Sequence, residues 1–258
     1  MHFRFSVDDN IIFLKDVTYS DYHSVFENPY LSMYKRLHEK YGVKVQLNLF
    51  YQTDDFNLSA MPDKFKNEWI ENSDWLQLSF HSRSENPMPP YRNSGYDEVF
   101  NDCKLVHDEI IRFAGEKALN LYTTIHCCET TNDGVLALHD AGICGLVGIF
   151  GTKENPRDCY GLNYEDYKAL YDQPYFYDYS SKMYFYNNSM IINKVDSGDV
   201  EKYLSACIGN EFIELMIHEQ YYYKDYPWYQ PDFQNKLDIA FSYLLNNGYK
   251  SVFIDEIV

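Results

Sequence analysis

The sequence predicts an α/β protein with one irregular, TIM-barrel-like (β/α) barrel of about seven strands. Strand patterns alternate with helical patterns along the chain, and its 258 residues match the roughly 250 typical of one such barrel. A doubly wound sheet would be favoured by a glycine-rich phosphate-binding motif, and the sequence contains none. We therefore expect a single domain over 1–258, with an irregular, Tyr-rich segment at about 150–189 that is an insertion or a region that covers the substrate.

The first strand is expected over 2–7, where polar and apolar residues alternate. Further strands are expected at 43–50, 75–80, 119–125, 143–149, 190–195, 211–217 and 250–254. Helices are expected between them, at 29–41, 62–72, 96–113, 133–141, 197–207 and 231–246. Pro29 suits a first helical turn and Gly42 a helix stop. The segments 10–27 and 81–95 are expected to be loops.

The charge composition of the chain restricts the classes of partner that it can bind. The chain has 22 Lys and Arg against 39 Asp and Glu, a net charge of −17, which repels phosphate backbones and anionic membranes. We therefore expect neither nucleic acid nor a membrane as a partner. The six cysteines lack the spacing of a disulfide framework and are interpreted as reduced thiols. With no signal-peptide pattern and no long apolar run, we expect a cytoplasmic protein. The sequence carries no signal for an oligomeric state.

Aromatic residues make up 18% of the chain and include 26 tyrosines. Their flat faces suit the C–H faces of sugar rings, although packing over the core explains them equally well. The stretch 221–229 follows a predicted strand, so we interpret it as part of a pocket wall, with Tyr222 as a candidate substrate contact.

Acidic and imidazole side chains gather at the ends of predicted strands. Because these ends share one face of an α/β barrel, we expect them to line one mouth: Asp8, Asp9, His81, Glu85, His126, Asp196 and His218. Arg92, in the loop that begins at His81, is a candidate substrate contact there, as is His126. Asp8 and Asp9 could instead cap a turn, Glu85 could pair with an arginine, and Asp196 could cap a helix.

These residue types suit metal-assisted hydrolysis. Asp9, His81 and Glu85 can hold one divalent ion, either Zn or, given the extra carboxylate, Mn, Mg, Fe or Co. Asp8 could take the proton of the attacking water, and His218 could give a proton to a leaving nitrogen.

The order of these elements resembles the polysaccharide deacetylase family, the NodB-homology group of metal-dependent N-deacetylases. Ser6-Val7-Asp8-Asp9 is similar to its opening T-F-D-D element, in which the first aspartate is the base and the second a metal ligand. The segment 81–85 is similar to its histidine motif, with Glu85 in place of the second histidine. Met216-Ile217-His218 is similar to its Leu-x-His motif.

The same resemblance implies a β/α barrel over nearly the whole chain and removal of an acetyl group from an N-acetylated sugar or related carbohydrate. It assigns Asp196 to tuning the catalytic histidine. The third motif, of Arg-Pro-Pro-Tyr type, is replaced by 124–128, so His126 could contact either substrate or metal. Two alternatives remain: a glycosidase with paired carboxylates about 5–10 Å apart, and a non-catalytic carbohydrate-binding relic of the fold.

Overall fold

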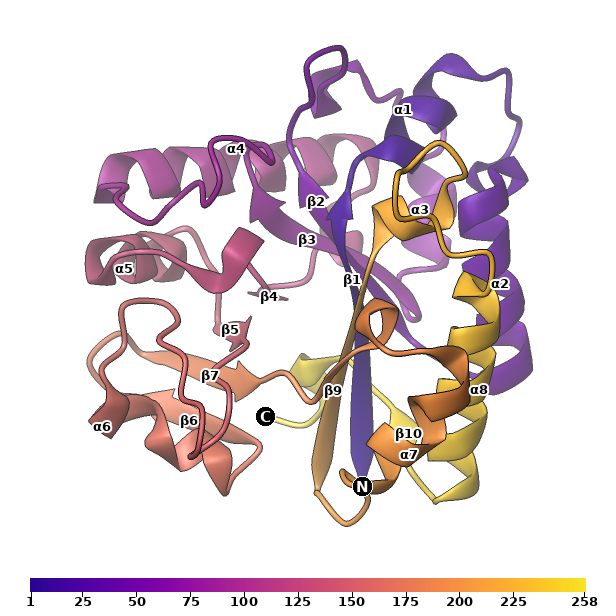
Figure 1. The fold of residues 1–258 in the computed structure, drawn as a ribbon. Coiled ribbons are helices and arrows are strands. Elements are labelled where there is room, and N and C mark those ends of the chain that lie inside the picture. The colour runs from indigo at the N-terminus through magenta and orange to yellow at the C-terminus, as the bar shows by residue number, and fades with distance from the viewer.

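A ring of parallel strands forms the centre of the protein, and the computed structural model describes all residues, 1–258 (Figure 1). One sheet has the order β3-β2-β1-β9-β8, and a second has the order β4-β5-β7-β6. The strands of the ring are β1 (His2–Asn10), β2 (Val45–Phe50), β3 (Leu76–Ser82), β4 (Tyr122–Thr123), β5 (Gly145–Gly148), β7 (Met183–Asn187), β8 (Met190–Ile191) and β9 (Phe212–His218).

Two junctions join the sheets into a barrel. β7 pairs with β5, and β8, which follows β7 after two residues, pairs with β9. At this switch the amide of Asn188 donates to the carbonyl of Gly148 at 2.8 Å, and that of Ser189 donates to the carbonyl of Glu214 at 3.0 Å. On the other side, the amide of Asn120 donates to the carbonyl of Leu78 at 2.8 Å and connects β3 to the start of β4. With β7 and β8 counted as one strand, the ring has seven, and the predicted barrel is confirmed.

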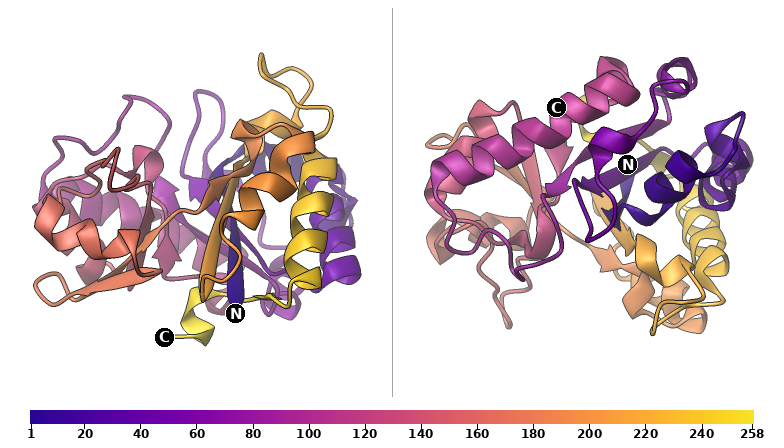
Figure 2. Two further views of the ribbon diagram at one scale, coloured as in Figure 1. Left: turned by 60° about the horizontal axis from the view of Figure 1, so that its bottom comes forward. Right: turned by 90° about the horizontal axis from the view of Figure 1, so that it is seen from above.

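Helices cover the barrel in two groups, which lie on opposite sides of it (Figures 1 and 2). The first group contains α2 (Pro29–Tyr41), α7 (Val200–Ser205) and α8 (Phe233–Asn246), and the second contains α4 (Tyr96–Phe113) and α5 (Asn132–Asp140). Shorter elements complete the fold: α1 (Ile12–Tyr19), α3 (Lys66–Glu71), α6 (Tyr164–Tyr167), the antiparallel edge strand β6 (Tyr175–Asp178) and β10 (Lys250–Ser251), which pairs with the start of β1.

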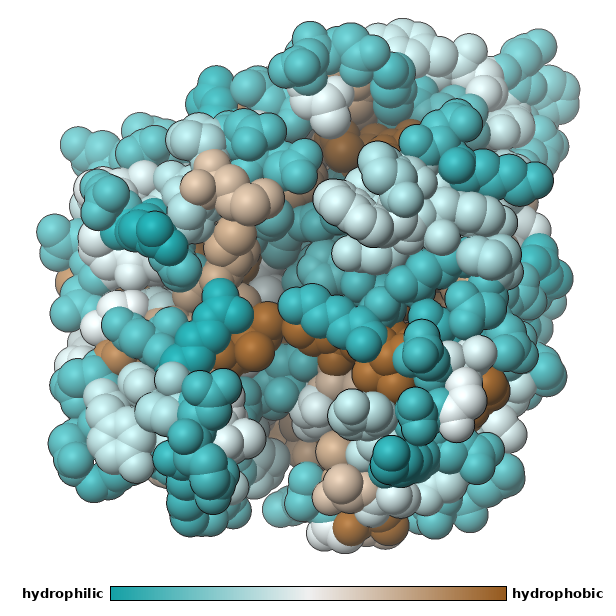
Figure 3. All heavy atoms as spheres, viewed as in Figure 1, coloured by the Kyte–Doolittle hydropathy of each residue, from teal (hydrophilic) through white to brown (hydrophobic).

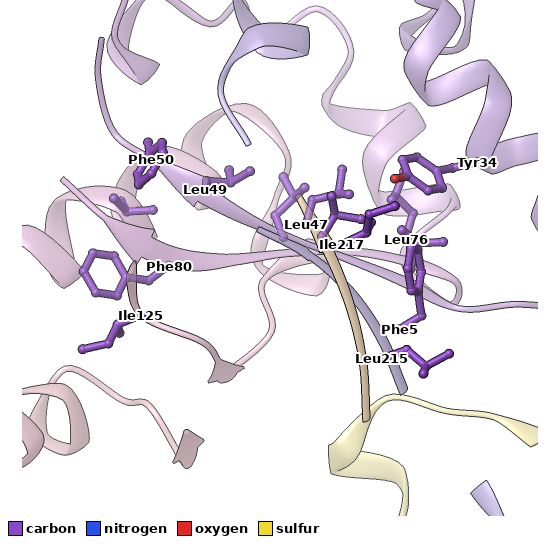
Figure 4. Close-up of a cluster of buried hydrophobic side chains, with 14 of the residues drawn as sticks. Phe5, Tyr34, Leu47, Leu49, Phe50, Leu76, Phe80, Ile125, Leu215 and Ile217 are labelled. Carbon is purple, nitrogen blue, oxygen red and sulfur yellow. The ribbon is translucent and has the colours of Figure 1, made fainter. Parts of the chain in front are cut away.

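The strands present apolar side chains outward to the helices. Phe5 of β1 lies edge-on to Phe241 of α8, with ring centroids 5.0 Å apart, and Phe5, Leu47 and Ile217 lie in one cluster with Tyr34 of α2 (Figure 4). Burying such side chains stabilises the fold by about 1.5–3 kcal/mol each. This layer holds the strands in place from outside and leaves the barrel interior for other residues.

The interior of the barrel is polar. Arg4 and Glu214, both fully buried, form an ion pair across β1 and β9. From Arg4 Nε a hydrogen-bond chain runs to Gln46 Oε1 at 3.3 Å, from Gln46 Nε2 to Asn48 Oδ1 at 2.7 Å, and from Asn48 Nδ2 to Asp8 Oδ1 at 2.6 Å. Buried polar groups are stable when hydrogen-bonded. This chain therefore supports Asp8 from below, at the end of β1.

Several predicted elements have the expected bounds, including the helices at 29–41 and 96–113. Gly42 ends the first of these with φ of 64°, a conformation that glycine adopts without strain. The prediction of a loop over 10–27 was wrong, because α1 forms there. The segment 150–189 is less irregular than expected, since it contains α6, β6 and the barrel strand β7. The fourth and last strands are shortened to two residues each, Tyr122–Thr123 and Lys250–Ser251.

The surface is largely hydrophilic in the view of Figure 3, and the hydrophobic residues visible there lie mainly in its recesses. No helix has both the length and the apolar character needed to cross a membrane. The cytoplasmic location expected from the sequence stays a prediction.

Candidate active site and metal-binding group

The two aspartates at the end of β1 point into one mouth. Asp8 lies in register with His218 of β9. Asp9 has φ of 63°, and the pairing of β1 with β2 shifts register between Val7 and Asn10. Such a bulge breaks the alternation of side chains along a strand. As a result, Asp9 faces the histidines of the neighbouring strand ends while Asp8 stays bonded to Asn48 inside the barrel.

Asp9, His81 and His126 form a compact group that could hold a metal ion. The Oδ1 atom of Asp9 lies 3.0 Å from His81 Nε2 and 3.1 Å from His126 Nδ1. The two ring nitrogens lie 3.2 Å apart. His81 comes from the end of β3 and His126 from the turn after β4.

The donor atoms of this group fit a small divalent cation. Two ligands that each lie about 2.0–2.2 Å from one ion are separated by roughly 3.0–3.5 Å, and all three separations fall in this range. The Nδ1 atom of His81 donates to the carbonyl oxygen of Thr124 at 2.5 Å. This bond fixes the ring and leaves Nε2 facing Asp9, as is usual for histidines that bind metal.

Electrostatics hold the carboxylate in its charged form. Burial favours the neutral acid, but hydrogen bonds with His126 and His81 outweigh it and hold the pKa of Asp9 well below its ordinary value. Burial also opposes protonation of His126, yet the contact with Asp9 raises the pKa of that imidazole to about 9. Without a cation, protons on the histidines would thus balance the charge of Asp9.

The position of His126 depends on an unusual turn. Cys127 and Cys128, which follow it directly, have φ of 65° and 57°, a conformation that costs a non-glycine residue about 1 kcal/mol or more. Phe50 packs against both imidazoles, with ring centroids 5.2 Å from His81 and 5.1 Å from His126. The Nε2 atom of His126 is buried without a hydrogen-bond partner. The Nδ1 atom of this ring, by contrast, faces Asp9 and His81 inside the group.

His218, at the end of β9 and beside Asp8 of β1, is oriented by an amide. Its Nδ1 atom donates to Oδ1 of Asn193 at 2.9 Å, which leaves Nε2 free. Burial lowers the pKa of His218, and Asp9 and Asp8 oppose the shift only in part. The neutral imidazole is thus favoured at neutral pH.

A cavity of about 400 Å³ opens above Asp9. It is suited to a small molecule or one sugar unit. Its lining contains three carboxylates, at Asp9, Asp54 and Glu85, together with Gln220 and Tyr226, and no lysine or arginine. Gln220 donates from Nε2 to Oδ2 of Asp9 at 2.7 Å, so both carboxylate oxygens are engaged.

Four predicted site residues lie elsewhere than expected. Glu85 is exposed at the rim of the cavity and outside the group that could hold a metal. Arg92 is exposed and paired with Glu129. Asp196 is exposed and is not the partner of His218. Tyr222 packs against Tyr30 and Phe233, with ring centroids 5.2 and 5.7 Å apart, instead of lining the cavity.

Sequence reasoning missed three residues that contact the site: Asn48, Asn193 and Gln220. Tyr226, which lines the cavity, lies in the stretch 221–229 that was expected to form part of a pocket wall. Asn48 could have been found, because it lies at the end of a predicted strand on the face that alternates with apolar residues. The two others lie in short turns after β8 and β9, where the sequence offers no comparable signal.

No family model matches the sequence, and no curated protein sequence matches it. Solved structures do match. The Bc1960 peptidoglycan N-acetylglucosamine deacetylase superposes on this chain with a TM-score of 0.54 at 13% identity. The match covers 99% of this chain and 87% of that protein. A mutant of BA3943, a CE4 family pseudoenzyme from Bacillus anthracis, gives 0.53 at 12%. The 4-alpha-glucanotransferase from Thermococcus litoralis gives 0.61 at 13% identity and is covered over 40% of its length.

This chain has the fold of the CE4 deacetylases. It spans 66% of the length of the BA3943 mutant. At identities of 12–13% the comparisons support a shared fold and nothing more. The role of each residue is therefore argued from the geometry of this chain.

Proposed function

We propose that this protein is a metal-dependent hydrolase that removes the acetyl group from an N-acetylated sugar or related carbohydrate. The observation that supports this most is the convergence of Asp9, His81 and His126 within hydrogen-bond distance of one another. Asp9 is next to Asp8, which is paired in register with His218, and Asp9 also lines a cavity of suitable size.

In this proposal Asp9, His81 and His126 hold one divalent ion, with His126 in place of Glu85. Two imidazoles and one carboxylate suit Zn²⁺, and also Fe²⁺, Co²⁺ or Mn²⁺. When bound, the ion would polarise the acetyl carbonyl and lower the pKa of a water molecule.

Asp8 is the proposed base. Its Oδ1 atom accepts a hydrogen bond from Asn48, so Oδ2 is left to take the proton of the attacking water. Water adds to the acetyl carbon, the C–N bond breaks, and acetate and an amine are the products. Holding the carboxylate in one orientation favours this transfer, because a base must lie within hydrogen-bond reach of the proton it accepts.

His218 is the proposed acid. Because Nδ1 donates to Asn193, Nε2 of the neutral ring is free to take up the proton that Asp8 accepted from the attacking water and to pass it to the leaving nitrogen. Burial lowers the pKa of His218, which makes the imidazolium a stronger acid, and the leaving amine then departs in neutral form. The carboxylate of Asp8 lies beside this histidine and can stabilise its charged form during transfer.

The proposal is tested with metal analysis and an acetate-release assay on N-acetylglucosamine and its oligomers. We expect one bound divalent ion per chain in the wild type, and loss of both ion and activity in Asp9→Ala and His126→Ala. Glu85→Ala, which alters another carboxylate of the same cavity, is the matched control and should retain the ion. Wild-type metal content in the first two variants would overturn the proposed ligand set.

A carboxylate-pair glycosidase is the second candidate, because Asp9, Asp54 and Glu85 line one cavity and a 4-alpha-glucanotransferase shares the fold. Its signature would be new reducing ends from an oligosaccharide without release of acetate and without dependence on metal. Binding of the oligosaccharide with neither product would instead favour a non-catalytic relic, as the CE4 family pseudoenzyme BA3943 exemplifies.

A further inference from the structure

A row of aromatic rings leads from the proposed acid to the surface. The ring of His218 lies 6.2 Å from that of Tyr221, which lies 5.2 Å from Tyr226, which lies 5.4 Å from Trp228 (centroid distances). Tyr226 also lines the cavity above Asp9. The row therefore begins at the site and continues past the rim of the cavity.

The outermost ring of this row is open to solvent. Trp228 is 66% exposed, whereas Trp69 and Trp75 are 1% and 4% exposed. It lies in the loop between β9 and α8, at the end of the barrel to which β1 points (Figure 1). An indole that is exposed to water does not gain the stabilisation that burial would give. Its packing against Tyr226 places it beside the cavity. A flat apolar face next to a polar cavity suits a sugar ring.

The charges around the cavity restrict what can bind. Its lining has three carboxylates, Asp9, Asp54 and Glu85, and no cationic side chain. A bound divalent ion would offset part of this charge at Asp9, whereas Asp54 and Glu85 would stay unbalanced at the rim. Phosphate and carboxylate groups on a ligand would be repelled there, while neutral or amino sugars would not.

We propose that Tyr226 and Trp228 form a stacking platform for a second sugar ring, so that the substrate is a neutral or basic oligosaccharide of at least two units. This rests on the proposed function. The ring that carries the acetyl group occupies the cavity above Asp9, and the next ring along the chain lies against the indole of Trp228. Sugar phosphates, nucleotide sugars and uronate-containing glycans are excluded as substrates by the acidic rim.

Tryptophan fluorescence tests the platform without any need for catalysis. Trp228 is the exposed one of the three tryptophans, so quenching by acrylamide reports on it almost alone. A trimer or tetramer of N-acetylglucosamine should protect the fluorescence from acrylamide at least twofold better than the monomer at equal concentration. Hyaluronan oligosaccharides of the same length, which carry a uronate in every second ring, should give no protection.

Kinetics of Trp228 variants test whether the platform contributes to turnover of the longer substrate. Trp228→Ala should lower the ratio of kcat/KM for the trimer to that for the monomer about tenfold, through KM, and Trp228→Phe should restore most of it. Tyr179→Ala, which removes an 86% exposed ring far along the chain, is the control for loss of an exposed aromatic and should leave the ratio unchanged.

Failure of the platform and failure of the proposed function give different results. Suppose that acetate is released from the trimer, but the trimer protects Trp228 no better than the monomer does and Trp228→Ala leaves the ratio of kcat/KM values unchanged. The platform is then refuted and the deacetylase stands. If the trimer protects Trp228 but no acetate is released, the platform stands and the proposed activity is refuted. Equal protection by hyaluronan oligosaccharides would refute the charge argument.

Discussion

The Nδ1 atom of His218 donates a hydrogen bond to Oδ1 of Asn193 at 2.9 Å, and Asp196, predicted for this role, is exposed. An amide orients an imidazole as a carboxylate does but adds no negative charge beside it. Asn193→Ala should therefore lower kcat for acetate release about 10–100-fold with little change in KM, because general acid catalysis contributes about 10²–10⁴-fold and depends on orientation. Steady-state kinetics measure this.

Asp196→Ala is the matched control for that experiment and should have wild-type kcat. Asn193→Asp should retain more activity than Asn193→Ala, since a carboxylate can accept the same bond. If Asp196→Ala lowers kcat as far as Asn193→Ala does, the assignment of Asn193 as the positioning residue fails.

Gln220 should tune metal affinity. Its Nε2 atom donates to Oδ2 of Asp9 at 2.7 Å, and residues that hold a metal ligand typically contribute 10–100-fold to affinity. We expect Gln220→Ala to weaken Zn²⁺ binding by about that factor in isothermal titration calorimetry. Gln234→Ala, at an exposed position of α8, should bind as the wild type does, and an unchanged affinity in Gln220→Ala would separate Gln220 from the ion.

Glu219 should stabilise the fold from a distance. Its carboxylate accepts hydrogen bonds from the amides of Ile11, Ile12 and Phe13, at 2.6, 2.9 and 2.7 Å, and so caps α1. Glu219→Gln replaces one acceptor oxygen by an NH₂ group that faces these donors, and we expect a loss of about 2 kcal/mol in the free energy of unfolding. Urea denaturation measures it, and Glu201→Gln, at an exposed position of α7, should stay within about 0.5 kcal/mol of the wild type.

His107 of α4 should make the protein sensitive to acid. Burial, with a smaller contribution from Lys104, lowers the pKa of this histidine to about 4, whereas the unfolded chain has the ordinary value of about 6.5. The stabilisation is complete above pH 6.5 and is lost as the pH falls towards 4, because only the unfolded state takes up the proton in that window.

Replacing His107 by Gln should therefore flatten the pH dependence. Between pH 7 and pH 4.5 the free energy of unfolding should fall by about 2 kcal/mol less in His107→Gln than in the wild type. His23→Gln, at an exposed position, should retain the wild-type slope. A parallel pair of curves for wild type and His107→Gln would show that His107 titrates normally in the folded state.

The features that the sequence predicted are those encoded locally. The alternation over 2–7 and the helical stripe over 96–113 arise from neighbouring residues, and β1 and α4 form there. The helix α1 was missed because Ile11 precedes it without a side-chain cap, and the acceptor for its free amides is Glu219, more than 200 positions later. A cap supplied by tertiary structure leaves no pattern in the segment that it stabilises.

The candidate metal ligands also depend on tertiary structure that leaves no pattern in the local sequence. Sequence spacing favoured Glu85, four positions after His81, but the loop leaves β3 at Ser82 and takes Glu85 to the rim. His126 lies with the group because Cys127 and Cys128 both adopt left-handed conformations. Such a turn usually requires glycine, so two cysteines gave no signal for it.

The pairing of β1 with β9 has a consequence for synthesis. His2 pairs with Phe212 and Asp8 with His218. One edge of β1 therefore stays unpaired while more than 200 further residues are translated, which takes roughly 10–40 s. During that time the strand exposes the charge of Arg4, which meets Glu214 only when β9 emerges. Inward-pointing charges are among the features by which proteins discourage wrong pairing at strand edges. The candidate site, which needs both Asp8 of β1 and His218 of β9, can therefore be completed only after this partner strand has been made.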